Sequence, residues 1–219
     1  FTFLNLTSTD SVGNGVRLNN LNSDLQVTGA TSIVGAAGTS LSITDTVAPP
    51  ATDSIQFNTV DITSRQNLGM LVDGIYGQVQ IGNLNIDNAN LVGGNAVQIS
   101  NTTNPGDPTG TDSGRVYING GTIDGALANG IQVQNALAAI SGATISNSGG
   151  QGILGLAAAG QQTTLEVSNS TITAAGVDGI RLSASGGGIL NATVLTNQIN
   201  VTANSLNAIV FDPTSVIML

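Results

Sequence analysis

The chain has 219 residues, a formal net charge of −9, and few charged (8%) or aromatic (3%) residues. A single Glu and no Lys argue against a helical bundle, and four Arg are too few for a nucleic-acid-binding surface. Because Cys and His are absent, disulfides, thiolate chemistry, Cys-type zinc sites and a histidine general base are excluded.

Apolar residues recur along the chain in groups of four, spaced by about five, eight and two residues. In chain order the groups are Phe3, Ser8, Val16, Leu18; Val27, Ile33, Leu41, Ile43; Phe57, Ile62, Met70, Val72; Ile81, Ile86, Val97, Ile99; Ile118, Ile123, Ile131, Val133; Ile140, Ile145, Ile153, Gly155; Val167, Ile172, Ile180, Leu182; and Val194, Ile199, Ile209, Phe211. The first members lie 24, 30, 24, 37, 22, 27 and 27 residues apart. Apolar residues alternate within each short run, as in a strand, and Gly and Asn gather between the runs.

A repeat of this length is too short to bury its own apolar face, but stacked repeats share a continuous core. The sequence therefore predicts an all-β fold, a single-stranded right-handed parallel β-helix (a β-solenoid) of about eight coils. One domain is expected over residues 1–219, and no apolar run approaches the ~18 residues of a transmembrane helix. Two polar segments rich in Pro, Asp and Thr, 44–55 and 100–114, interrupt the repeat and are predicted to be inserted loops.

A polar residue, usually followed by Gly, lies two residues before the third apolar position of most groups. These residues are Asn14, Asn95, Asn129, Asp178 and Asn207, together with Gln151. Asn and Gly tolerate a left-handed backbone at a sharp corner, and stacked Asn side chains can hydrogen-bond between coils. We expect this polar corner column to be structural.

The step Asn129-Gly130-Ile131-Gln132-Val133 resembles the parallel β-helix repeat of pectin-lyase-like proteins, and similar steps cover nearly the whole chain. The resemblance implies the fold and leaves the function open, because that superfamily includes polysaccharide lyases, glycoside hydrolases, phage tailspikes and bacterial surface adhesins. The Gly- and Asn-rich, Cys-free composition is most similar to adhesin-type passengers. This similarity implies an extracellular or cell-surface location, in a bacterium.

The best pair of carboxylates for acid–base chemistry or cation binding is Asp87 with Asp124. Each follows the second apolar position of its group, so the two are predicted to lie on adjacent coils, about 5 Å apart. This separation matches the carboxylate pair of a retaining glycosidase, although other members of the column, Thr63, Ser146, Thr173 and Asn200, are merely polar. Solvated Asp side chains are the simpler interpretation, and a Ca²⁺ site is the alternative.

The inserted segment 100–114 offers a second candidate Ca²⁺ site, at Asp107 and Asp112. Both lie among Gly, Pro and Thr, and oxygen ligands closely spaced around Gly can wrap a calcium ion. The EF-hand pattern and the Gly-Gly-x-Gly-x-Asp repeat are absent. No other cofactor is expected. No catalytic residue is assigned, because no acidic cluster lies beside the Arg residues that could serve as the base of a lyase: Arg17, Arg115 and Arg181.

Both ends of the repeat are apolar, whereas the terminal coils of a solenoid need caps. The residues are Phe1, Phe3, Leu4, Val216, Ile217 and Leu219. We expect them to be covered, either by further coils or by a second copy stacked end to end. The leading interpretation is a non-catalytic extracellular structural protein: a cell-surface stalk, an adhesin segment or a filament subunit. The alternatives are a carbohydrate-binding or polysaccharide-degrading β-helix, or a phage fibre; nucleic-acid binding and membrane insertion are not expected.

Overall fold

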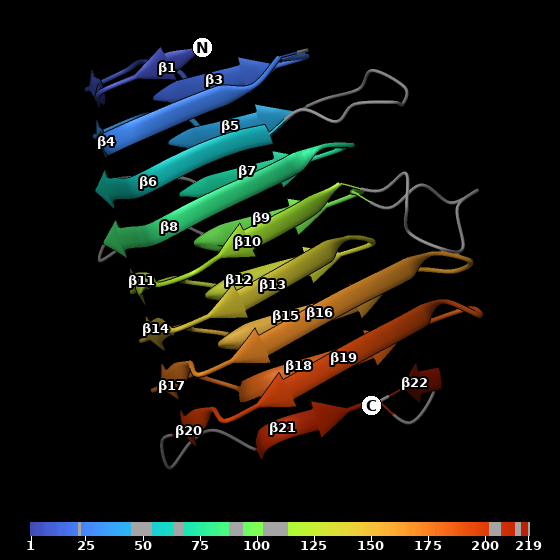
Figure 1. The fold of residues 1–219 in the computed structure, drawn as a ribbon. Helices are drawn as coiled ribbons and strands as arrows, with labels where there is room; N and C mark the ends of the chain where they lie inside the picture. The colour runs from blue at the N-terminus through green and yellow to red at the C-terminus, as the bar shows by residue number, and fades with distance from the viewer. Residues whose placement is uncertain are drawn as a thin grey trace.

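The protein is a parallel β-solenoid in which every strand pair is parallel (Figure 1). The computed structural model describes residues 1–21, 23–44, 54–63, 68–87, 94–102, 114–201, 207–212 and 216–218, and these residues contain strands and turns but no helix. In Figure 1 the front strands run to the left and the rear strands to the right while the chain descends, so the helix is right-handed. The predicted fold class is confirmed.

The rear of each coil is one strand of an eight-stranded sheet. Its strands are β3 (Val16–Asn19), β5 (Leu41–Thr44), β7 (Met70–Asp73), β9 (Val97–Ser100), β12 (Ile131–Gln134), β15 (Ile153–Ala157), β18 (Asp178–Ala184) and β21 (Asn207–Phe211).

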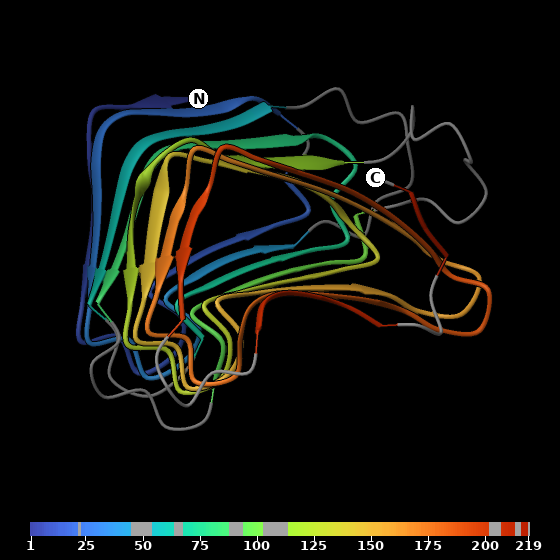
Figure 2. The same cartoon turned by 90° about the horizontal axis from the view of Figure 1, so that it is seen from below.

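The remainder of each coil belongs to a fourteen-stranded sheet that bends into two faces. Three long strands run through both faces: β4 (Leu25–Val34), β6 (Ser54–Thr63) and β8 (Gln78–Asp87). The first face also holds β1 (Thr2–Phe3), β10 (Arg115–Ile118), β13 (Leu137–Ser141), β16 (Gln162–Ser168), β19 (Ile189–Leu195) and β22 (Val216–Met218). The second face holds β2 (Leu6–Thr9), β11 (Gly121–Asp124), β14 (Ala143–Ser146), β17 (Thr171–Thr173) and β20 (Gln198–Asn200). Viewed along the axis, the coils superimpose and enclose one interior (Figure 2).

The predicted register is observed at every step of the ladder. The first positions pair in succession from Phe3 to Val194, and the second positions pair from Ser8 to Ile199. The third and fourth positions pair along the eight-stranded sheet from β3 to β21. The differences in spacing between groups are therefore absorbed outside the paired positions, and the four apolar columns are continuous.

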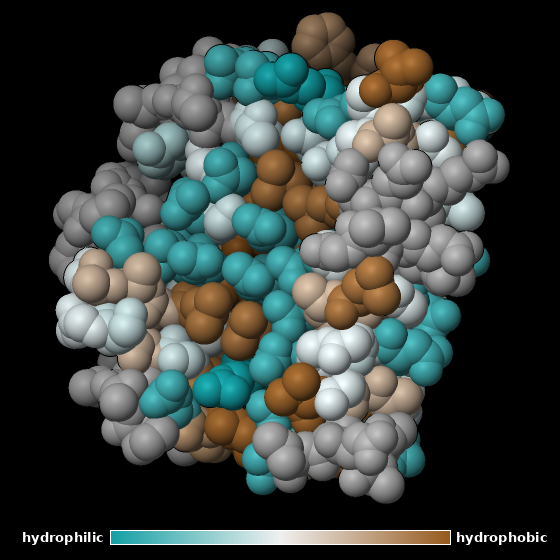
Figure 3. Space-filling view, turned by 180° about the vertical axis from the view of Figure 1, so that it is seen from behind, coloured by the Kyte–Doolittle hydropathy of each residue, from teal (hydrophilic) through white to brown (hydrophobic). Residues whose placement is uncertain are grey.

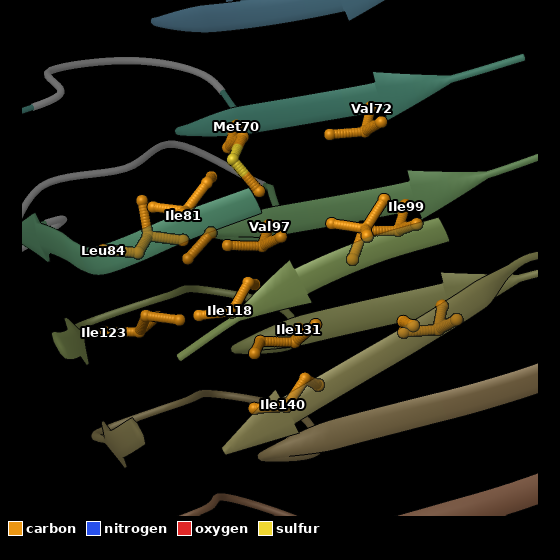
Figure 4. Close-up of a cluster of buried hydrophobic side chains, with 14 of the residues drawn as sticks. Met70, Val72, Ile81, Leu84, Val97, Ile99, Ile118, Ile123, Ile131 and Ile140 are labelled. Carbon is orange, nitrogen blue, oxygen red and sulfur yellow. The ribbon is translucent and has the colours of Figure 1, made fainter. Parts of the chain in front are cut away.

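The interior is filled by these columns of mostly β-branched side chains (Figure 4). Ile123 is 1% exposed, and Ile118 and Ile131 are completely buried. Burying one such side chain contributes ~1.5–3 kcal/mol, and the stacked coils repeat this contribution along the rod. The low aromatic content follows from the shape of the interior, because Ile, Val, Leu and Ala fill narrow stacked rows.

Fewer coils are fully packed than the sequence predicts. Between the terminal strands β3 and β21 lie six strands of the rear sheet, so about six turns have neighbours on both sides. The terminal repeats pair in register but remain partly exposed: no residue of β2, β3, β20 or β21 is fully buried. The prediction of about eight coils counted these edge repeats as complete turns.

The neighbouring strands extend into both segments that the sequence predicts to be loops, 44–55 and 100–114. Thr44 ends β5, Ser54 and Ile55 begin β6, and Ser100 ends β9. Residues 45–53 and 103–113 lie outside the described residues.

Candidate functional site

Asp87 and Asp124 are register partners on adjacent coils, at the ends of β8 and β11. The Oδ1 atom of Asp124 accepts hydrogen bonds from Ser146 Oγ (2.5 Å) and Asn147 Nδ2 (2.7 Å). Both donors belong to the following coil, whereas Asp87 lies on the preceding one. The Asp124 carboxylate is thus held by a cross-coil contact.

The same contact occurs elsewhere in the rod, which explains its role. Asp73 Oδ1 accepts hydrogen bonds from Ser100 Oγ (2.7 Å) and Asn101 Nδ2 (2.9 Å) of the next coil. In both cases an Asp ends a strand, and a Ser-Asn step ends its neighbour. Asn101 has a φ of 52° and Asn147 has a φ of 53°, the left-handed conformation that turns the chain at these corners. The repeated contact is a structural clamp between coils.

A shallow hollow of about 240 Å³ lies on the second face around Asp87 and Asp124. Asp61 and Asn85 also line it, and Asn85 Nδ2 donates to Asp61 Oδ1 (2.8 Å). The backbone N–H of Thr122 in turn donates to Asn85 Oδ1 (3.1 Å). The Oδ1 atoms of Asp61 and Asn85 therefore accept hydrogen bonds in a ladder that links three coils.

Cation binding at the predicted residues receives no geometric support. Within the part of the chain that the structure describes, no three Asp, Glu, His or Cys side chains are grouped so that they could hold a metal ion. Asp87 and Asp124 lie side by side as two carboxylates, and Asp107 and Asp112 lie outside the described residues. A calcium site at these residues stays a prediction.

The polar corner column forms a ladder of side-chain hydrogen bonds. Asn95 Oδ1 accepts from both the backbone N–H (3.1 Å) and Nδ2 (3.0 Å) of Asn129, and Asn129 Oδ1 accepts from the Gln151 N–H (3.0 Å). Further along, Asn207 Nδ2 donates to Asp178 Oδ1 (3.4 Å), and Asp178 is 1% exposed beside Arg181, at 3.8 Å.

The backbone of the corner column does not adopt the left-handed conformation that Asn and Gly tolerate at sharp corners. No predicted corner residue has a positive φ; the left-handed non-Gly residues lie at other corners, namely Asp10, Asn20, Asn101, Asn135, Asn147, Asn169, Ala174 and Thr196. The side chains of Asn95 and Asn129 instead accept hydrogen bonds from backbone N–H groups of the neighbouring coil.

The sequence pattern did not predict the polar groove that lies on the first face. It has a volume of about 300 Å³ and is lined by Gln26, Gln56 and Gln80, among other residues. These three Gln side chains are register partners on successive coils, and Gln26 Nε2 donates to Gln56 Oε1 (3.4 Å). The signal in the sequence was a Gln directly before the first apolar position of three successive groups.

The next residue in this Gln column is Tyr117, and the guanidinium of Arg115 lies 5.9 Å from the centre of its ring. Arg115 begins β10. Arg17 and Arg181 share an outward column and are separated by five intervening coils, so they belong to different parts of the surface.

The predicted assembly residues lie at the two ends of the rod. Phe1 is 72% exposed, Phe3 42% and Leu4 74%. Val216 and Ile217 belong to β22, whose backbone pairs with β19, and Leu219 lies outside the described residues. Seen from behind, the hydrophobic residues form separate patches between hydrophilic ones (Figure 3).

The described residues include no helix with the length and apolarity needed to cross a membrane.

Comparisons of the chain with protein-family models, with curated proteins and with solved structures found no match.

Proposed function

We propose that the chain is a non-catalytic structural protein, a rigid β-solenoid segment that acts as a spacer in an extracellular stalk, adhesin or filament. The observation that carries this proposal is the unbroken register of four apolar columns through every described coil. Each coil is fixed to its neighbours by backbone ladders and a shared core, which resists bending between coils.

The surface chemistry supports the same proposal. The carboxylates of Asp73 and Asp124 accept hydrogen bonds from the next coil, and Asn95 of the corner column accepts from Asn129 of the next coil. These polar atoms therefore hold neighbouring coils together. The Cys-free, Gly- and Asn-rich composition favours a bacterial surface protein, and the Asn129–Val133 step favours kinship with pectin-lyase-like β-helices.

The proposal is tested by imaging the purified chain and by assaying it on polysaccharides. We expect negative-stain images to show straight rods of constant width. We also expect pectate, alginate and neutral glucans to show no new reducing ends and no unsaturated uronate absorbance. Release of either product would overturn the non-catalytic assignment, and its loss in the Asp87→Asn/Asp124→Asn double variant would assign the chemistry to that pair.

The polar groove favours a second candidate function, the binding of a neutral glycan. Amide side chains match sugar hydroxyls as donors and acceptors, and the Gln column presents three of them at the ~4.8 Å spacing of adjacent strands. Tyr117 continues the column with an aromatic ring on which a sugar can stack.

Glycan binding is tested by calorimetry with linear neutral oligosaccharides. The Gln56→Ala/Gln80→Ala variant removes the amides at the centre of the groove and should abolish binding. Gln162→Ala is the matched control, because Gln162 lies on the same face three coils beyond Gln80. Equal affinity in all three proteins, or no binding to the unmodified chain, would eliminate this candidate.

A further inference from the structure

The chain contains three Asn-Gly steps, and one of them is held differently from the other two. The steps are Asn14-Gly15, Asn119-Gly120 and Asn129-Gly130. An Asn side chain can close a ring onto the backbone nitrogen of the next residue, and Gly favours this reaction because it has no Cβ and its backbone turns freely. In a folded protein the rate of closure depends on how firmly the two reacting groups are held.

Two of the steps are fixed by hydrogen bonds between coils. The Gly130 N–H donates to the Gln151 carbonyl (3.0 Å), and the Gly15 N–H donates to the Thr39 carbonyl (3.2 Å). The side chain of Asn129 is also fixed, because it is 8% exposed and its Oδ1 accepts a hydrogen bond from the Gln151 N–H. Ring closure at these steps therefore requires local opening of the coil.

The step at Asn119 lies in the short connection between β10 and β11, and its reacting groups are not held in this way. The Asn119 side chain is exposed and makes no hydrogen bond within the described part of the chain. The Gly120 N–H likewise has no acceptor among the described residues, although the Asn119 N–H donates to Ile81 (2.9 Å) and the Gly120 carbonyl accepts from Leu84 (3.0 Å). Ring closure at this nitrogen breaks no existing hydrogen bond.

Burial of Gly120 does not protect its nitrogen from the preceding side chain. Gly120 is buried, which keeps groups from outside the protein away from its backbone. The Asn119 side chain, however, is attached one residue away and needs only to rotate toward that nitrogen. Water reaches the exposed Asn119 side chain, which the second step of the reaction requires.

We propose that Asn119 is a site of spontaneous deamidation, at which the folded protein converts a side-chain amide into a carboxylate. The inference goes beyond the proposed structural function, and it holds whether or not the polar groove binds a sugar.

The reaction needs only hydroxide and water. The Gly120 nitrogen gives its proton to hydroxide and attacks Cγ of Asn119, so that a nitrogen–Cγ bond forms. The Cγ–Nδ2 bond then breaks, and Nδ2 takes a proton from water and leaves as ammonia. Water opens the resulting five-membered ring at either of its carbonyls, which yields aspartate or isoaspartate. In sum, one amide and one water give one carboxylic acid and one ammonia, and nothing is oxidised or reduced.

The conversion would change the polar groove on the first face. Asn119 lines this groove together with Gln80 and Gly82. An amide donates and accepts hydrogen bonds, whereas a carboxylate only accepts. The groove would therefore lose a donor and gain a negative charge, in a chain whose formal net charge is already −9. Isoaspartate would also lengthen the backbone of the connection that is bonded to β8.

The other two Asn-Gly steps serve as internal controls in the experiment. The purified folded chain is incubated at mildly alkaline pH, digested with trypsin and sequenced by tandem mass spectrometry, and the signal of an unincubated sample is subtracted. Cleavage after Arg115 and Arg181 leaves Asn119 and Asn129 in one peptide, so both conversions are read from the same spectrum. Asn14 is read from the first tryptic peptide, and isoaspartate is detected by labelling with an isoaspartyl methyltransferase.

We expect Asn119 in the folded chain to convert about tenfold faster than Asn14 or Asn129, because those two steps must first open. Isoaspartate should be among the products, and the rate should rise with pH because hydroxide generates the nucleophile. In urea the three steps should convert at similar rates. Asn119→Gln should remove the reaction, because its longer side chain would need a larger ring. Asn58→Gln, at another residue lining the groove, is the matched control and should leave conversion of Asn119 unchanged.

Equal rates at the three steps of the folded chain would overturn the inference, as would faster conversion at Asn14 or Asn129. Absence of conversion at Asn119 in the folded chain would also overturn it, whatever the unfolded chain does. Formation of aspartate without isoaspartate would exclude the ring and with it the proposed role of Gly120. The imaging and polysaccharide assays test the structural function separately, because none of these outcomes changes what they measure.

Discussion

At the scale of single residues, the corner glycines are explained by space. Gly15, Gly130, Gly152 and Gly179 precede the third apolar column, and an ideal Cβ on each would collide with the Cγ2 of a second-column Ile. At Gly130 this Cβ would lie 2.5 Å from Ile145 and 2.6 Å from the Gly152 carbonyl. The φ angles of these glycines are not left-handed, so close packing between coils imposes the choice.

Gly130→Ala should therefore destabilise the protein by about 1–3 kcal/mol, the usual cost of an overpacked interior. The measurement is the free energy of unfolding in urea. Gly13→Ala is the matched control, because a Cβ at Gly13 meets nothing within 4 Å and its φ is not positive. We expect that control to be neutral or slightly stabilising; equal losses at both positions would contradict the packing explanation.

A second residue-scale prediction concerns the cross-coil clamp at Asp124. Asp124→Ala removes the acceptor of two hydrogen bonds and should lower the free energy of unfolding by about 1 kcal/mol, because the site is partly solvated. Asp124→Asn keeps an Oδ1 acceptor and should lose less. If the Asn variant were as unstable as the Ala variant, charge rather than hydrogen-bond acceptance would hold the two coils together.

At the scale of strands, the contribution of an apolar side chain depends on whether its coil has neighbours on both sides. Ile123 and Ile199 occupy the same column, yet Ile123 is 1% exposed and Ile199 is only partly buried. The difference arises because the coil of Ile199 has one neighbour in the described structure.

Ile123→Ala should cost ~2–5 kcal/mol of unfolding free energy, the range for a fully buried Ile, and Ile199→Ala clearly less. Urea denaturation of the two variants, followed by circular dichroism, compares them directly. Similar losses would show that the terminal coil is packed as tightly as an inner one, and would count against a partly exposed edge.

The strand register was predictable from the sequence because β-branched residues mark the inward positions. Even the 37-residue step from Ile81 to Ile118 preserves pairing, since both residues are flanked by alternating inward and outward side chains. The clamp at Asp73 and the groove at Gln56 were not predicted. Their polar residues occupy outward positions, where the sequence tolerates many side chains, and only the stacking of coils gives them neighbours.

At the scale of the whole molecule, stability should fall from the middle of the rod toward its ends. Each coil is stabilised by its own packing and by its contacts with neighbours, and the terminal coils lack one neighbour in the described structure. Local opening therefore costs least in β2, β3, β20 and β21.

Hydrogen exchange followed by mass spectrometry should find the slowest amides in β9 and β12 and the fastest in the terminal strands. Uniform protection along the rod would contradict the graded picture.

Differences in repeat length fall in the connecting segments and leave the paired strand positions unchanged, and this has an evolutionary consequence. Three extra residues separate Ile86 from Val97 relative to Ile123 and Ile131, yet both pairs keep their places in the ladder. Insertions at such junctions leave the pitch intact, whereas one residue inserted inside a strand would exchange its core and solvent faces. The lineage of such a protein should therefore diversify by lengthening its connections, and the same junctions are the natural places to graft foreign peptides.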